Sequence, residues 1–83
     1  MNDEQLLDLV SSTETMSFYE LCSALGEDRP EKDDRKAWWE LFQALERLEK
    51  AGLIEVERDA KSRIDSLILT EAGVSEVREA RMR

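Results

Sequence analysis

The hydrophobic residues of the N-terminal part recur every three or four positions, which is the spacing of one face of an α-helix. Leu6, Leu7 and Val10 fall on one such stripe and predict a first helix over residues 3–12. The residues around 11–15 are polar and predict a break in the chain.

A second helix is predicted directly after Ser17, whose side chain can cap its start. Glu20 stands three residues later and can close a capping box, while Met16 and Leu21 occupy the positions of a hydrophobic staple. Gly26 is expected to end the helix in a left-handed conformation. The apolar stripe between these signals consists of Phe18, Leu21, Cys22 and Leu25.

A third helix follows a charged connector, residues 27–34, which contains the single proline. Asp33 or Asp34 can cap this helix, which is expected to run to about Ala51 and to stop at Gly52. Its predicted buried face is made by Trp38, Leu41, Leu45 and Leu48, with Phe42 at the edge.

The hydrophobic period then changes from the helical one to the alternation of a β-strand. Residues 54–57 and 66–69 predict two strands, joined by the polar residues 58–63 into a hairpin. Thr70 is expected to cap a last helix over residues 71–82. The fold class that follows is α+β, mainly α, in a single domain over residues 1–83.

The composition excludes most catalytic and metal-binding classes. The chain has no histidine and a single cysteine, Cys22, so His-based nucleophiles, internal disulfides and the common zinc sites are excluded. Its three glycines stand alone and form no phosphate-binding loop. We therefore expect a non-enzymatic protein without a metal or cofactor, and we expect Cys22 to be a buried structural thiol.

The location of the protein is also predicted from composition. No apolar run approaches the ~20 residues that span a bilayer. The polar, acidic start of the chain does not resemble a secretory signal. These features predict a soluble, cytoplasmic protein that does not bind a membrane.

The net charge of −8 is concentrated at one end of the sequence. Residues 1–34 contain ten acidic residues against two basic ones, whereas residues 35–83 contain ten of each. The acidic balance argues against attraction of the whole surface to nucleic acid, but it leaves room for one neutral or basic face.

Two segments carry a resemblance to a known family. "ALERLEKAGLIEVERD" (residues 44–59) and "LILTEAG" (residues 67–73) resemble the winged helix-turn-helix domains of MarR- and PadR-type transcription regulators. The resemblance implies an N-terminal helix and break, a helix-turn-helix, a β-hairpin wing and a C-terminal helix, at residues 1–15, 16–52, 53–70 and 71–83. The connector 27–34 departs from the family pattern, because the turn at this place in those regulators is about eight residues shorter.

The resemblance implies that the third helix reads double-stranded DNA and that the wing contacts the DNA backbone. Gln43 could pair with an adenine edge, and basic residues near the helix start could bind phosphate. The expected contacts are Arg35, Lys36, Trp39, Gln43 and Arg47 on the helix, and Arg58, Lys61 and Arg63 on the wing. In this hypothesis the protein is a small regulator of bacterial or phage type that forms a homodimer through its first and last helices.

The alternative is a winged-helix module that binds a protein. Glu40 would lie among phosphates on the DNA-reading face, and Trp39 is a more common anchor of protein interfaces than a reader of DNA. Two further interpretations stay open: Trp39 could cover the core beside Trp38, and the basic residues could be a solvated surface. The acidic connector is expected to be a solvated loop, with phosphate mimicry as a minor alternative.

Overall fold

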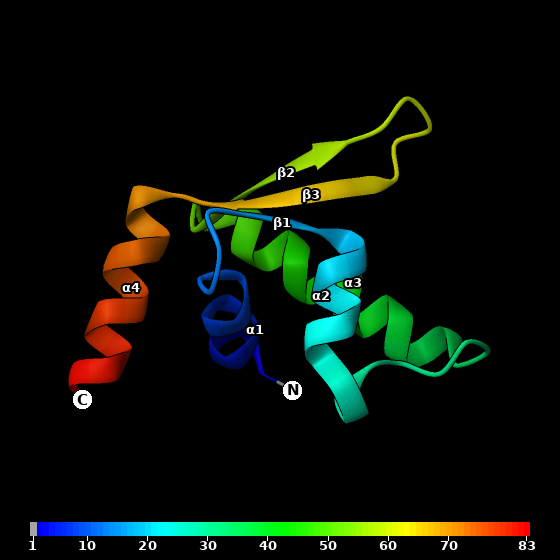
Figure 1. The fold of residues 1–83 in the computed structure, drawn as a ribbon, viewed down its shortest axis with the longest axis horizontal. Helices are drawn as coiled ribbons and strands as arrows, with labels where there is room; N and C mark the ends of the chain where they lie inside the picture. The colour runs from blue at the N-terminus through cyan, green and yellow to red at the C-terminus, as the bar shows by residue number, and fades with distance from the viewer. Residues whose placement is uncertain (1) are drawn as a thin grey trace.

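The computed structural model describes residues 2–83, which form four α-helices and a three-stranded antiparallel sheet. The fold is therefore a small α+β fold that is mainly helical, as the sequence predicts (Figure 1). A short 3-10 turn, Gly26–Asp28, follows the second helix. The elements are α1 Asp3–Val10, β1 Thr15–Ser17, α2 Phe18–Leu25, α3 Arg35–Lys50, β2 Ile54–Arg58, β3 Ile64–Leu69 and α4 Glu71–Met82.

The strand order in the sheet is β1-β3-β2, so β3 lies between the other two strands. Met16 of β1 and Val56 of β2 both pair with Leu67 of β3. The predicted sheet was therefore incomplete, because β1 adds a third strand to the expected hairpin. The assignment of residue 15 to a polar break was wrong, since Thr15 belongs to β1. The pattern could not show β1, because its single apolar residue, Met16, stands between Thr15 and Ser17 and gives no visible alternation.

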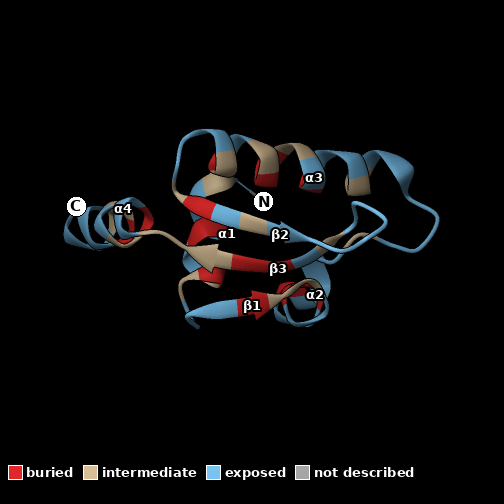
Figure 2. Cartoon of the chain, turned by 90° about the horizontal axis from the view of Figure 1, so that it is seen from above, coloured by how far each residue is buried: buried red, intermediate tan, exposed pale blue. Residues whose placement is uncertain are grey.

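The sheet forms one layer, and α1, α2 and α3 lie beneath it, with α4 beside α1 (Figure 1). The view onto the sheet shows buried residues along β3 and exposed ones toward the tip of the hairpin (Figure 2). The core draws on every layer, because Leu6 of α1, Leu45 of α3, Ile54 of β2 and Leu67 of β3 are each at most 1% exposed. Cys22 is buried as expected, and burial raises the pKa of its thiol.

Three predicted helix caps are confirmed, at Ser17, Asp34 and Thr70. The hydroxyl of Ser17 accepts a hydrogen bond from the Glu20 N–H at 3.0 Å. Asp34, rather than Asp33, caps α3 by accepting from the Ala37 N–H at 3.0 Å. At α2 the return bond from the Ser17 N–H to the Glu20 carboxylate is not among the hydrogen bonds of residues 2–83, so the capping box is only half formed.

Two glycines end the helices where the sequence places the stops. Gly26 has a φ of 55° and Gly52 a φ of 77°, a region that other residues seldom adopt. After Gly52 the chain turns into β2, and the Leu53 N–H donates to the Leu48 carbonyl at 3.0 Å. The glycine at residue 52 therefore sets the direction in which the hairpin leaves α3.

The start of α4 is fixed to this same turn. The Thr70 hydroxyl donates to the Gly52 carbonyl at 2.6 Å and accepts from the Gly73 N–H at 3.0 Å. The Thr70 N–H donates to the Leu53 carbonyl at 3.1 Å. Gly73 packs so closely on this turn that a β-carbon there would overlap the Leu53 carbonyl oxygen. One threonine and one glycine thus join α4 to the junction between α3 and β2.

Candidate functional site

The predicted site residues lie on α3 and on the β2–β3 hairpin, which project toward the same end of the molecule in both views (Figures 1 and 2). Trp39 and Gln43 lie one turn apart on α3, on the side opposite the core. Trp39 is 62% exposed, whereas Gln43 is half-buried. The interpretation that Trp39 covers the core is therefore wrong.

The neighbouring Trp38, rather than Trp39, packs against the hydrophobic core. It is half-buried and packs with Phe18 and Phe42 at ring-centroid distances of 6.4 and 6.2 Å. Its indole N–H donates to the Glu31 carbonyl at 2.9 Å, which ties the connector to α3. Because Trp38 makes these contacts, Trp39 is left on the outside one residue further along the helix.

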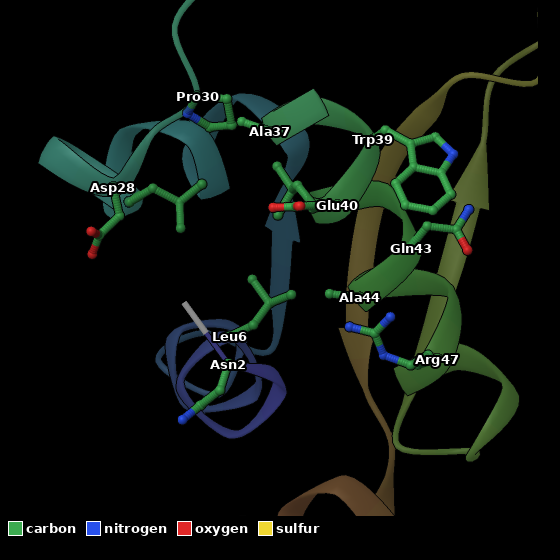
Figure 3. Close-up of a pocket in the computed structure, with 12 residues that line it drawn as sticks. Asn2, Leu6, Asp28, Pro30, Ala37, Trp39, Glu40, Gln43, Ala44 and Arg47 are labelled. Carbon is green, nitrogen blue, oxygen red and sulfur yellow. The ribbon is translucent and has the colours of Figure 1, made fainter. Parts of the chain in front are cut away.

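Arg47 turns away from the expected DNA-reading face and toward α1 (Figure 3). Its guanidinium donates two hydrogen bonds to the Asp3 carboxylate, at 2.8 and 2.9 Å. This bond is the main reason that the pKa of Asp3 is lowered. Sequence spacing on α3 could not indicate the pair, because the two residues are 44 positions apart.

We expect Arg47→Met to return the pKa of Asp3 to the ordinary range of an aspartate, because the charged partner and both hydrogen bonds are lost. A depressed folded-state pKa stabilises the fold above the unfolded pKa of about 3.9, and this contribution disappears as the pH falls through the lower folded value. A carboxyl ¹³C NMR titration measures the midpoint. The pKa of Asp59, which is lowered by other contacts, provides the internal control. An unchanged Asp3 midpoint would refute the assignment.

The arginines of the hairpin are also paired within the chain. Arg63 lies 3.2 Å from the Asp59 carboxylate, and Arg58 lies 3.9 Å from that of Glu49. Asp59 also accepts backbone hydrogen bonds from Lys61 and Arg63 at 2.8 and 3.0 Å, which lower its pKa. The Asp59 carboxylate therefore orders the turn through Lys61 and Arg63, whereas Arg58 is paired with Glu49 outside the turn.

The hairpin turn contains a strained position. Ser62 has a φ of 62° although it is not a glycine, and its N–H donates to the Asp59 carbonyl at 2.9 Å. We expect Ser62→Gly to stabilise the protein by about 0.5–1 kcal/mol, since glycine adopts this conformation without steric cost. Denaturant unfolding measures the change. Ser62→Val should be destabilising in the same assay, and a loss of stability in the glycine variant would contradict the assignment.

Among residues 2–83, Arg35, Lys36 and Lys61 form none of the salt bridges. Arg35 and Lys36 begin α3, where exposed N–H groups were expected to favour phosphate. The Asp34 carboxylate, however, caps this end and places a negative charge there. The helix start is therefore less favourable to an anion than the sequence suggested.

A cleft of about 410 Å³ lies beside Trp39, between α3, the start of α1 and the connector (Figure 3). Its apolar lining includes Leu6, Leu25 and Leu41, from three different helices. Trp39, Glu40 and Asp28 also line it. The cleft could not be predicted from the sequence, because each of these leucines belongs to the apolar stripe of its own helix and no local pattern shows where the helices leave a gap.

The terminal helices pack against each other within one chain. Leu6, Leu7 and Val10 of α1 are all at most 2% exposed. Arg81 of α4 lies 2.9 Å from the Asp8 carboxylate. The apolar stripe of α1, which motivated the homodimer, is therefore used inside the monomer, and the dimer itself stays a prediction.

Within residues 2–83, no helix is both long and apolar enough to cross a membrane, and no three metal-ligating side chains form a cluster. Comparisons with family models, curated proteins and solved structures found no match to this chain.

Proposed function

We propose that this chain is a winged-helix module without enzymatic activity that binds a protein partner through the outward face of α3. The winged-helix interpretation is supported by the β2–β3 hairpin directly after α3 and by the close packing of α4 on the turn between them. A hairpin and then a C-terminal helix after the third helix are what the resemblance to MarR- and PadR-type domains implies.

The observation that carries the proposal is the exposure of Trp39. A tryptophan that is 62% exposed on the outer side of a regular helix leaves a large apolar surface in water. Tryptophan is enriched at the centres of protein interfaces, because it buries a large area with few rotatable bonds. Phe42, one turn away at the edge of the helix, is also exposed, so the apolar surface is larger than one side chain.

The charges near this surface also favour a protein over DNA. Residues 35–69, which span α3 and the hairpin, contain seven acidic and seven basic residues. The connector 27–34 adds five acidic residues and two basic ones at the same end of the molecule. DNA-binding faces generally carry an excess of basic residues, because binding depends on neutralising phosphates.

Double-stranded DNA is the second candidate partner, and one observation favours it. The start of α3 and the tip of the hairpin point the same way (Figure 1). They carry Arg35, Lys36 and Lys61, which form no salt bridge with any residue of the described range 2–83. The ion pairs of Arg58 and Arg63 are exposed to solvent, and such pairs are weak, so phosphates can replace their partners.

A titration of fluorescent mixed-sequence duplex DNA separates the two functions. We expect no measurable rise in anisotropy at low salt, because α3 and the hairpin together carry no net positive charge. Binding that weakens steeply with rising salt, and that is lost in an Arg58→Glu, Arg63→Glu double variant, would make DNA the partner instead.

The protein interaction is tested by capture from a lysate of the source organism on immobilised wild-type chain and on the Trp39→Ala variant. We expect a partner that is retained by the wild type, released by excess free chain and absent from the variant. Equal retention by the two chains would reject Trp39 as the anchor and, with it, the proposed function.

A further inference from the structure

The cleft beside Trp39 is lined by apolar residues at its base and by acidic residues at its sides. Leu6, Leu25 and Leu41 are between 1% and 8% exposed and contribute its base. Its volume of about 410 Å³ is larger than any one amino-acid side chain and falls in the range of about 300–1,000 Å³ typical of binding pockets. It can therefore accept apolar side chains from outside the molecule.

The ionised groups that line the cleft are Asp28, Glu40 and Arg47. The charge of Arg47 is offset by the two hydrogen bonds to Asp3, so the two carboxylates dominate. Asp28 lies in the 3-10 turn at the end of α2, whereas Glu40 lies on α3, and neither forms a salt bridge among residues 2–83. The cleft thus presents negative charge on two of its sides.

The surrounding surface has the same sign. The helices α1 and α2 and the connector, which meet α3 here, belong to residues 1–34, and this part of the chain carries the whole net charge of −8. A long-range field of this kind attracts a cationic partner and repels an acidic one.

We propose that this cleft binds a cationic amphipathic helix of the partner protein, with apolar side chains in the cleft and lysine or arginine residues against Asp28 and Glu40. The proposal rests on the protein-binding function above and specifies the chemistry of its partner. Trp39 also contributes to the lining, but its ring points to the other side of α3 in Figure 3, so it contacts the partner protein beside the bound helix. This is the helix-in-groove mode of recognition, in which apolar residues spaced three and four apart serve as anchors.

The probe is a short synthetic helix with leucine at positions i, i+3, i+4 and i+7 and lysine at the exposed positions. The matched control peptide has glutamate in place of every lysine. Binding to the methyl-labelled chain is followed by NMR, with the methyl groups of Leu6, Leu25 and Leu41 as reporters. We expect the lysine peptide to shift these signals and the glutamate peptide to leave them unchanged.

Charge variants identify the site. The Asp28→Asn, Glu40→Gln double variant should bind the lysine peptide roughly tenfold more weakly, since both carboxylates are neutralised with little change of shape. A Glu71→Gln, Glu79→Gln double variant on α4 makes the same change in net charge and should bind within twofold of the wild type.

Equal loss of affinity in the two double variants would show non-specific attraction and would overturn the proposal. So would tight binding of the glutamate peptide, the absence of binding by the lysine peptide, or shifts confined to other elements. The capture experiment distinguishes this failure from that of the proposed function. A partner lost by Trp39→Ala but retained by Asp28→Asn, Glu40→Gln would leave the function intact and reject the cleft.

Discussion

Gly73→Ala is expected to destabilise the protein by about 2–3 kcal/mol, although alanine is normally the better helix former by about 1 kcal/mol. The reason is that a β-carbon at this position overlaps the Leu53 carbonyl oxygen and lies 2.7 Å from Cδ1 of Leu69. The Leu53 carbonyl cannot easily move, because it accepts the Thr70 N–H at 3.1 Å and belongs to the turn that leads into β2. Urea unfolding followed by circular dichroism measures the loss.

Ser75→Ala is the matched control for this prediction. Ser75 is exposed on the same helix, so its replacement gains helix propensity without a steric clash and should be neutral or slightly stabilising. The two alanine substitutions should therefore change stability in opposite directions. A stabilised Gly73→Ala variant would mean that α4 does not dock on the α3–β2 turn in the way described.

Trp39→Ala is expected to weaken the complex with the captured partner by roughly 30-fold or more, the effect of an interface hot spot of about 2 kcal/mol. The side chain is mostly exposed and lies outside the buried core. Its removal should therefore lower the free energy of unfolding by no more than about 0.5 kcal/mol. Calorimetric titration of the partner and denaturant unfolding of the variant measure the two quantities.

Two further variants complete this test. Trp39→Phe keeps an aromatic ring and should retain most of the affinity. Tyr19→Ala removes an aromatic residue on α2 that is 79% exposed, and it should leave the affinity unchanged. If Tyr19→Ala weakens the complex as much as Trp39→Ala, the interface is not centred on α3 and the proposed site is wrong.

Much of the secondary structure could be predicted from local signals. The caps at Ser17, Asp34 and Thr70 and the stops at Gly26 and Gly52 depend on a few neighbouring residues, and each is present in the structure. The predicted ends of two elements were wrong. The helix α1 ends at Val10 rather than near residue 12, and the strand β2 extends to Arg58 rather than ending at residue 57. The ends of helices and strands depend on packing as well as on local preference, and this explains both differences.

The candidate site was much less predictable than the fold. Helical spacing correctly placed Trp39 outside, but it also placed Arg47 on a free outer face where the structure has it bound to Asp3. The basic residues of the wing were identified correctly as exposed, yet their pairing with Asp59 and Glu49 was not visible in the sequence. Charge counting along the chain cannot reveal such pairs, because they depend on side-chain positions in space.

The sequence by itself determined the four α-helices, the hairpin and the uneven charge, because these follow from hydrophobic period, caps and composition within short windows. Only the tertiary structure decided that Thr15–Ser17 joins the sheet, that Arg47 is bound to Asp3, and that a cleft opens between α1 and α3. Each of these depends on contacts between residues far apart in the chain. Such contacts form only when the apolar faces of several elements are buried together, so no local pattern records them.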